Sequence, residues 1–239
     1  MAIDDTDNRQ SRGTGFLARR LAERLEQEGL AVIEGVTRHQ LFVDDLIPYT
    51  SHNSAACIMA EGSELSKIIQ RCRNIVSSDS AEGSDPGLCV VPVSEVDDDI
   101  TNWGYRAKTE VLKMDDAFAL AEKKGIYLEG LGGTRGGVIG SLAAVGLNKA
   151  GNDGRFLWVK GMRKYMGVMR IREILEETGV VEIRCEKGML DDPNLRILLP
   201  EWWRPLLKDH KQVLIVEPTH HHLYEYQLIT KDHLKRLSC

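Results

Sequence analysis

The chain opens with Met1-Ala2-Ile3-Asp4-Asp5-Thr6-Asp7 and continues through Arg12-Gly13-Thr14-Gly15 into an amphipathic stretch that ends near Glu28. Apolar residues that run directly into acids are typical of a buried strand followed by a polar loop. In the amphipathic stretch the apolar residues share one helical face, and Gly29 suits the end of a helix. This beginning predicts the order strand, acidic loop, helix.

Hydrophobic periodicity assigns the remaining elements. Further helices are expected at residues 64–76, 110–124, 138–147 and 170–177, and strands at residues 30–43, 54–60, 88–93, 156–159, 180–185, 213–216 and 223–229. Turn-forming residues at 149–154 separate two groups of elements. We therefore predict an α+β protein whose N-terminal part is α/β-like, with a larger domain at residues 1–151 and a smaller, ferredoxin-like one at residues 152–239.

Composition limits the class of protein. Of 239 residues, 42% are hydrophobic, and 31 Lys and Arg against 36 Asp and Glu leave a net charge of −5. Such a chain is globular, and any polyanion-binding surface on it would have to be local. The five cysteines show no CxxC spacing, and acids near the N-terminus argue against a signal peptide. We expect a cytoplasmic protein without a zinc site, disulfide framework or membrane partner. A homo-oligomer is left open.

The acids after the first strand are candidate metal ligands. Mg²⁺ prefers carboxylate oxygens and typically takes one or two of them together with waters and substrate phosphates. Asp4, Asp5 and Asp7 lie at the end of a strand, where such a group could hold a metal on a phosphate. The alternative is a solvated acidic turn.

The segment before the first helix is a candidate phosphate-binding loop. Arg12, Gly13, Thr14 and Gly15 combine a cation, two small residues and a hydroxyl at a helix start, where backbone N–H groups favour an anion. Thr14 could also be an ordinary helix cap.

A second candidate loop holds six glycines between Gly130 and Gly140. Gly133, Gly136 and Gly137 could cradle a ligand through backbone amides, with Arg135 as an anion clamp. The loop matches neither the dinucleotide-binding nor the P-loop pattern. A hinge between packed elements explains the glycines equally well.

Other polar groups are weaker candidates. Four of them lie beside strands and could orient a substrate, with a histidine assisting proton transfer, namely Arg38, His39, His52 and Asn53. Asp98 belongs to an acidic run, residues 97–99, that is either a solvated loop or part of a cationic-substrate site. Residues 155–172 contain six bases and no acid, which suggests either a local polyanion patch or a solvated edge. Three consecutive histidines, residues 220–222, would point alternately on an extended chain, so we expect no metal site there.

Four segments together resemble a known family. They are Ile3-Asp4-Asp5-Thr6-Asp7, Arg12-Gly13-Thr14, Ser84-Asp85-Pro86-Gly87 and Gly136-Gly137-Val138-Ile139-Gly140-Ser141-Leu142-Ala143-Ala144-Val145-Gly146. This set resembles the archaeal isoleucine-tRNA 2-agmatinylcytidine synthetases, which use ATP to join agmatine to a tRNA cytidine. The resemblance implies a kinase-like domain followed by a ferredoxin-like one, with agmatine held near their junction. It also implies that Asp4, Asp5 and Asp7 hold Mg²⁺ and ATP, and that Thr14 matches an autophosphorylated threonine.

The chain departs from this pattern in two places. We expect the family's OB-fold and zinc-ribbon regions to be absent, and the segment Tyr49-Thr50-Ser51-His52-Asn53-Ser54 lacks the cations that the resemblance implies for it. From these departures we predict that the acceptor is a small polar molecule, such as an agmatine-like amine, and not tRNA.

The leading hypothesis is an ATP- and Mg²⁺-dependent phosphotransferase or ligase-like enzyme, in which Arg135 offsets developing charge and the glycine loop closes over the ligand. Two alternatives stay open. One is a non-catalytic module that binds an amine or nucleotide, and the other is an RNA-binding accessory protein that uses residues 155–172.

Overall fold

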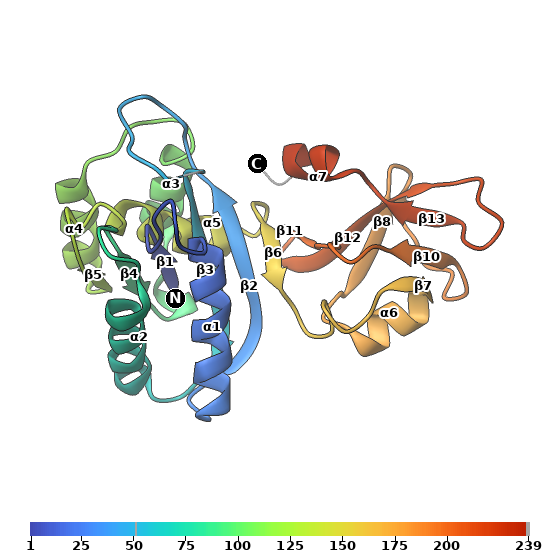
Figure 1. Ribbon diagram of the computed structural model, residues 1–239, viewed down its shortest axis with the longest axis horizontal. Coiled ribbons are helices and arrows are strands. Elements are labelled where there is room, and N and C mark those ends of the chain that lie inside the picture. Colours follow the sequence, from blue (N-terminus) through green and yellow to red (C-terminus); the bar gives the residue numbers. More distant parts are fainter. Residues whose placement is uncertain (51, 238–239) are drawn as a thin grey trace. The chain divides into compact units, whose positions relative to one another are not determined.

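The computed structural model describes residues 1–50 and 52–237. The chain divides into two compact units, Met1–Ala150 and Gly151–Cys239, drawn in blue to yellow-green and in yellow to red in Figure 1. The division lies one residue from the predicted boundary. The predicted mixed α+β class is confirmed. Ser51, Ser238 and Cys239 lie outside the described residues.

The first unit is built on an antiparallel sheet. Its strands lie in the order β5 (Tyr127–Gly130), β4 (Gly87–Val90), β1 (Ala2–Asp4), β3 (Ser54–Glu61) and β2 (Val32–Gln40), and each pairs with its neighbour antiparallel. Strands that alternate in direction bring the ends of β1, β2 and β5 to the same edge as the starts of β3 and β4. That edge collects four loops, which follow β1, join β2 to β3, precede β4 and follow β5.

Helices cover both faces of this sheet (Figure 1). Helix α5 (Val138–Ala150) packs against the sheet on one face, and α1 (Thr14–Gln27) and α2 (Leu65–Asp79) pack on the other. Ala2 joins the α5-side core. Its neighbour Ile3, also fully buried, must point to the opposite face because side chains alternate along a strand.

Two more helices pack against α5. They are α3 (Asp98–Arg106), preceded by the short 3-10 turn Val93–Glu95, and α4 (Met114–Lys124). A Cβ on Gly146 of α5 would lie 2.1 Å from the Ile100 carbonyl oxygen, and one on Gly104 would lie 2.9 Å from the Ala143 carbonyl oxygen. The small residues of α5 therefore allow α3 to approach closely.

Helix α3 corrects the prediction for this region. The sequence predicts a polar loop at residues 97–99 and a helix from residue 110, whereas α3 begins at Asp98 and α4 only at Met114. The Asp97 carboxylate caps α3 by accepting hydrogen bonds from the backbone N–H groups of Asp99 and Ile100. An acid before apolar residues at helical spacing is a helix-start signal.

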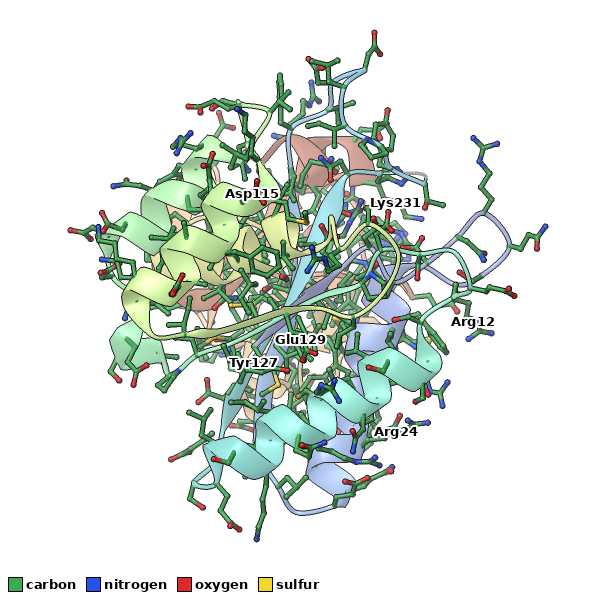
Figure 2. All side chains as sticks on the ribbon, turned by 90° about the vertical axis from the view of Figure 1, so that its left-hand side faces the viewer. Arg12, Arg24, Asp115, Tyr127, Glu129 and Lys231 are labelled. Atoms are coloured by element: carbon green, nitrogen blue, oxygen red, sulfur yellow. The ribbon has the colours of Figure 1, made fainter. Side chains whose placement is uncertain are left out.

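Edge strand β5 is also missing from the prediction, which assigns no element to residues 126–128 and interprets the end of this strand as the start of the glycine loop. Tyr127 and Glu129 share one face of β5 and lie beside α2 in Figure 2. There the Arg73 Nε donates to both Glu129 carboxylate oxygens, at 3.1 and 3.0 Å. The glycine loop is therefore shorter than expected, and it runs from the end of β5 to the start of α5.

The second unit contains mostly short strands. Its main order is β6 (Arg155–Trp158), β11 (Leu206–Lys208), β12 (Lys211–Pro218), β13 (Tyr226–Leu228), β10 (Arg196–Leu199) and β7 (Gly167–Arg170); β8 (Glu182–Cys185) pairs with β12 and with β9 (Gly188–Met189). Helix α6 (Ile171–Glu177) joins the core around Trp203 and Leu214. Helix α7 (Lys231–Leu237) follows the last strand, whereas a ferredoxin-like unit ends on a strand. The ferredoxin-like arrangement therefore stays a prediction.

Helices long and apolar enough to cross a bilayer do not occur in the described part of the chain.

Candidate active site

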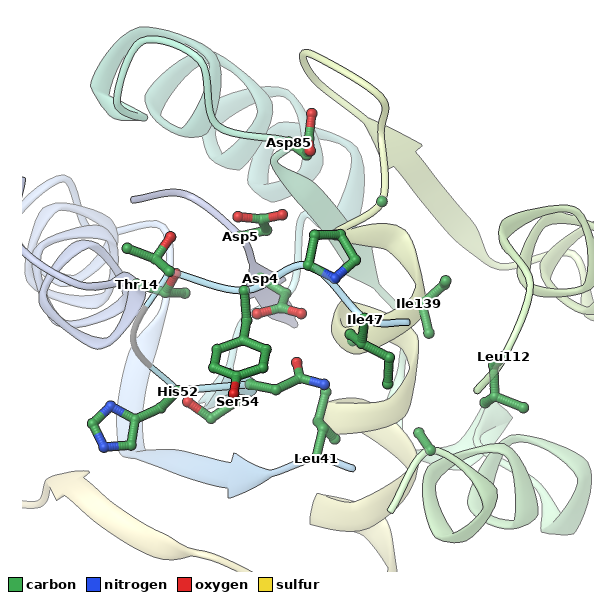
Figure 3. A pocket seen from close by; sticks show the side chains of 18 of the residues that line it. Asp4, Asp5, Thr14, Leu41, Ile47, His52, Ser54, Asp85, Leu112 and Ile139 are labelled. Carbon is green, nitrogen blue, oxygen red and sulfur yellow. The ribbon is translucent and has the colours of Figure 1, made fainter. Parts of the chain in front are cut away.

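A cavity opens where the loops of the first unit meet (Figure 3). Its walls come from the acidic loop after β1, the loop between β2 and β3, the turn before β4, the α3–α4 connection and the glycine loop. The lining residues are Asp4, Asp5, Asp7, Thr14, Leu41, Ile47, Pro48, Tyr49, Thr50, His52, Asn53, Ser54, Asp85, Ala107, Glu110, Leu112, Thr134, Gly136, Gly137, Ile139 and Gly140. One half of this wall is acidic and the other is apolar.

Four aspartates make up most of the acidic half. Asp4, Asp5 and Asp7 follow β1, and Asp85 reaches the cavity from the turn before β4. Burial, reinforced by the charges of Asp5 and Asp7, raises the pKa of Asp4 to about 7. Burial and the charges of Asp85 and Asp7 raise the pKa of Asp5 to about 6. The protein thus holds together negative charges that repel one another.

The backbone at Asp5 is strained. Its φ is +51°, in the left-handed region that favours glycine. A non-glycine residue in this region costs about 1 kcal/mol or more and is kept where the surrounding structure requires it. The strain and the repulsion occur at the same residue, which is typical of a ligand-binding site.

The donor chemistry of this cluster fits a hard divalent cation. Carboxylate oxygens are what Mg²⁺ prefers, and a cation would relieve the repulsion among them. Within residues 1–50 and 52–237, however, no group of three or more His, Cys, Asp or Glu side chains is arranged to hold a metal ion by itself. The cluster therefore fits Mg²⁺ bound by one or two carboxylates together with the phosphates of a ligand.

Thr14 lies beside this cluster at the first turn of α1. Its hydroxyl donates to Asp7 Oδ1 at 2.8 Å, and its backbone N–H reaches the same oxygen at 3.3 Å. The backbone N–H and the hydroxyl of Thr6 both contact the Thr14 oxygen, at 3.2 and 3.1 Å. A hydroxyl held against a carboxylate can give up its proton to that carboxylate, so the pair has the geometry of a nucleophile and its base.

The glycine loop is held against the acidic loops by its backbone. The Thr134 N–H donates to Asp85 Oδ1, and the Gly137 N–H donates to the Asp85 carbonyl oxygen at 2.9 Å. A Cβ on Gly137 would lie within 2.5 to 2.7 Å of the backbone atoms of Gly87, Asp85 and Asp4. A Cβ on Gly140 would lie 1.8 Å from Asp4 Oδ2. These two glycines are thus required for close packing around Asp4.

Several predicted phosphate-binding residues do not line this cavity. Gly133 is absent from its wall, and a Cβ there would strike Asp85 Oδ1. The guanidinium of Arg135 lies 5.6 Å from the ring centroid of Phe118, and that of Arg12 lies 4.4 Å from the ring centroid of Phe16. Both arginines are exposed. Gly136 and Gly137 do line the cavity.

The predicted substrate residues do not all meet at this cavity either. Arg38 and His39 are neighbours on β2 and therefore point to opposite faces of the sheet. His39 is fully buried, with Nε2 2.8 Å from the Thr37 hydroxyl, which also accepts from the Asn148 side chain at 2.9 Å. This network gives His39 a structural environment inside the first unit.

Two further predicted substrate residues line the cavity and one does not. His52 and Asn53 belong to its wall. Figure 3 shows the His52 imidazole turned away from Asp4. The Asn53 side chain donates to the Phe42 carbonyl oxygen at 2.6 Å and so supports the β2–β3 loop. Asp98 is exposed at the start of α3 and does not line the cavity.

Sequence reasoning misses part of the site. It places Asp85 only within a family segment and assigns Glu110 to a helix. It also does not anticipate the apolar half, which comprises Leu41, Ile47, Pro48, Tyr49, Ala107, Leu112 and Ile139. A proline and a carboxylate in loops next to strands are weak signals, and only folding shows that these loops share one edge of the sheet.

The acidic cluster makes a testable prediction for pH dependence without added metal. The folded pKa values of Asp4 and Asp5, about 7 and about 6, lie above the ordinary 3.8, so the folded protein binds more protons than the unfolded chain between these values. Their contribution to stability is therefore full below about pH 4 and is lost as the pH rises toward about 7.

Thermal unfolding in EDTA from pH 4.5 to 8 checks this expectation. Carboxylates with lowered pKa values, such as Glu182 and Glu225, lose their stabilising effect only as the pH falls. The readout is therefore the difference in melting temperature between wild type and Asp4→Asn, which should grow in favour of the variant as the pH rises. A difference that is constant over this range would contradict the assigned environment of Asp4.

Solved structures of one family are similar to this chain. No protein-family model matches the sequence, and no curated protein matches it either. Among solved structures, apo TiaS, an agmatidine synthetase that acts on an isoleucine tRNA, matches 61% of this chain and 34% of its own, at 26% identity and a TM-score of 0.53. The complex of TiaS with that tRNA and ATP matches 61% of this chain and 35% of its own, at 27% identity and a TM-score of 0.53. The chain is similar to the agmatidine synthetase family.

A further TiaS structure carries the isoleucine tRNA, AMPCPP and agmatine; it matches 60% of this chain and 35% of its own, at 26% identity and a TM-score of 0.52. The chain thus spans about a third of the length of the TiaS chains that it matches. The family resemblance seen in the sequence is confirmed. The expectation that excluded tRNA is wrong, because two of these TiaS structures are complexes with tRNA. That expectation rests on the length of the chain and on the cations missing from residues 49–54, and neither of these identifies the acceptor.

Proposed function

We propose that this chain provides ATP-dependent ligase chemistry of the agmatidine synthetase kind, with an RNA cytidine as acceptor and an agmatine-like amine as the second substrate. The observation that carries the proposal is the cavity at the sheet edge, where Asp4, Asp5, Asp7 and Asp85 share a wall with Thr14. TiaS complexes with tRNA and ATP, and with tRNA, AMPCPP and agmatine, support it.

The acidic half of the cavity would receive the phosphates of ATP together with Mg²⁺. When bound, Mg²⁺ neutralises charge on the phosphates and on the carboxylates. Asp4 and Asp5 are the best candidates to hold it, because their raised pKa values mean that a cation beside them is favourable. Asp85 also holds the glycine loop through Thr134, so it would keep the cavity closed on this side.

Thr14 would accept the terminal phosphoryl group of ATP. Its oxygen attacks the γ-phosphorus, the bond from that phosphorus to the bridging oxygen breaks, and ADP leaves. The Thr14 proton passes to Asp7 Oδ1, which lies 2.8 Å away. The two Thr6 contacts hold the Thr14 oxygen in place before the reaction, which lowers the entropic cost of the step.

The apolar half of the cavity would receive uncharged parts of the substrates. Leu41, Ile47 and Ile139 can contact a base or an alkyl chain, while Glu110 and the aspartates attract the cationic end of an amine. The proposed placement of the charged and the uncharged parts of the substrates thus matches the acidic and the apolar sides of the cavity.

A ligand-binding and turnover experiment tests the proposal. We expect Mg²⁺ and ATP together to raise the melting temperature by several degrees, and agmatine to raise it further only in their presence. Repeated release of ADP and phosphate should require an RNA stem-loop with an unpaired cytidine. Stabilisation without turnover would favour the non-catalytic binding module, and the absence of any Mg²⁺-dependent shift with ATP would rule out the proposed site.

A further inference from the structure

Thr6 is a buried polar residue in the acidic loop that follows β1. It is the single uncharged residue at positions 4–7, and it is only 3% exposed. Unlike the three aspartates around it, Thr6 does not line the cavity. Its backbone is anchored, since its carbonyl oxygen accepts a hydrogen bond from the Ala81 N–H at 3.0 Å. Thr6 is thus held behind the cavity wall, where its N–H and hydroxyl reach Thr14.

The direction of each hydrogen bond at the Thr14 oxygen follows from the chemistry of its partners. The Thr14 hydroxyl lies 2.8 Å from Asp7 Oδ1. Asp7 must be ionised to take a proton, and an ionised carboxylate can only accept, so the single Thr14 hydroxyl proton points to Asp7. The Thr6 hydroxyl, 3.1 Å from the same Thr14 oxygen, is then a donor, as is the Thr6 backbone N–H at 3.2 Å. The Thr14 oxygen therefore donates one hydrogen bond and accepts two, both from Thr6.

The two hydrogen bonds from Thr6 are long for their kind. Oxygen–oxygen hydrogen bonds usually measure about 2.5–3.0 Å and nitrogen–oxygen ones about 2.7–3.2 Å. Hydrogen bonds to a negatively charged oxygen are shorter and roughly twice as strong. When Thr14 loses its proton to Asp7, negative charge develops on the oxygen to which Thr6 donates. Interactions that are weak before a reaction and strong during it lower the activation barrier.

We propose that Thr6 is a catalytic residue that stabilises the developing charge on the Thr14 oxygen through its hydroxyl and its backbone N–H. The inference rests on the proposed function, in which Thr14 attacks ATP. In that step the Thr14 O–H bond breaks and its proton moves to Asp7 Oδ1. The freed electron pair forms the bond to the γ-phosphorus, and the bond from that phosphorus to the bridging oxygen breaks, with ADP as the leaving group. Thr6 itself is unchanged at the end of the step.

The transition state and the burial of the two threonines increase the effect of these donors. In the loose transition state described for phosphoryl transfer, the bond to the attacking oxygen is only partly formed, so the charge left by the proton stays largely on that oxygen. Thr6 and Thr14 are both buried, which limits competition from water and strengthens electrostatic interactions between them. Loss of a single donor should therefore slow the reaction measurably.

Single-turnover phosphorylation of the full chain tests the proposal. The protein is mixed with Mg²⁺ and ATP, and mass spectrometry measures the rate at which Thr14 becomes phosphothreonine. Thr6→Val removes the hydroxyl at nearly constant volume and should lower this rate by roughly tenfold to a hundredfold, the range for a hydrogen bond to a charged group. The ATP concentration that gives half the maximal rate should stay unchanged, because Thr6 does not line the cavity. Thr6→Ser keeps the donor and should stay close to the wild-type rate.

Thr37→Val is the matched control. Thr37 is another buried threonine of the first unit, and its hydroxyl lies 2.8 Å from His39 Nε2 and accepts from the Asn148 side chain at 2.9 Å. It does not line the cavity, so loss of its hydroxyl should lower the stability of the fold and leave the phosphorylation rate unchanged. If the Thr6 hydroxyl were only structural, both valine variants would lose stability and neither would lose rate.

The outcomes separate this inference from the proposed function. A Thr6→Val protein that phosphorylates Thr14 at the wild-type rate overturns the role of Thr6 and leaves the proposed function intact. A wild-type chain that binds Mg²⁺ and ATP but forms no phosphothreonine refutes the phosphoryl transfer itself, and the role of Thr6 with it. A Thr6→Ser rate as low as that of Thr6→Val also overturns the inference, because the donor is then not responsible. If Thr6→Val does not fold, Thr6→Ala removes the same hydroxyl without a methyl group in its place, and a wild-type rate for that variant has the same meaning.

Discussion

Replacing Asp4 by Asn is expected to lower ATP turnover by at least about a hundredfold while making the metal-free protein more stable. The carboxylate would hold Mg²⁺ on the phosphates, and loss of such electrostatic stabilisation typically costs this much. Without metal, the same carboxylate is buried among like charges, which raises its pKa to about 7. At pH 8 its removal should stabilise the folded state by up to about 4 kcal/mol, since the pKa rises from 3.8 to about 7 and one pKa unit corresponds to about 1.4 kcal/mol.

Opposite effects on turnover and stability distinguish a ligand-binding role from a structural one. Turnover would be measured as release of ADP and phosphate with Mg²⁺, ATP, agmatine and RNA, and stability by thermal unfolding in EDTA. Asp115→Asn is the matched control, because Asp115 lies in the first turn of α4 (Figure 2) and does not line the cavity that contains Asp4. An Asp4→Asn protein that is less stable than wild type, or that keeps its turnover, would show that the assigned role is wrong.

Two neighbouring glycines should respond very differently to Ala. Gly137→Ala places a Cβ 2.5, 2.6 and 2.7 Å from backbone atoms of Gly87, Asp85 and Asp4, and backbone cannot move aside cheaply. We expect a loss of more than about 3 kcal/mol of stability, together with loss of the Mg²⁺ and ATP response, because the loop and β1 must separate. At Gly136 the nearest atom is the Thr134 hydroxyl oxygen at 3.4 Å, an ordinary contact.

Gly136→Ala is therefore the matched control, with an expected change within about 0.5 kcal/mol. Both variants would be compared by urea unfolding, with Trp103 of the first unit as a buried fluorescent reporter. Similar stabilities for the two variants would contradict the close packing described around Gly137. A large loss for Gly136→Ala alone would mean that the loop has a different conformation.

The sequence predicted those parts of the site that are local in the chain. Asp4, Asp5, Asp7 and Thr14 follow one another within the first strand, loop and helix, and periodicity is sufficient to place them. The helix after the glycine loop was predicted for the same reason, since its small and apolar residues are contiguous. The short elements α3 and β5 are not predicted. The Asp97 cap determines the start of α3, and pairing with β4 determines β5, more than hydrophobic periodicity does.

Tertiary structure decided which of the candidates meet. Local sequence is sufficient to predict an acidic strand end, a hydroxyl at a helix start and a glycine-rich loop. Antiparallel pairing of β1 with β3 and β4 then brought Asp85 and the β2–β3 loop to that strand end. Alternation along β2 separated Arg38 from His39, leaving Arg38 partly exposed and placing His39 in the core. Strand direction and side-chain alternation are set by pairing across the sheet, which no single stretch of sequence contains.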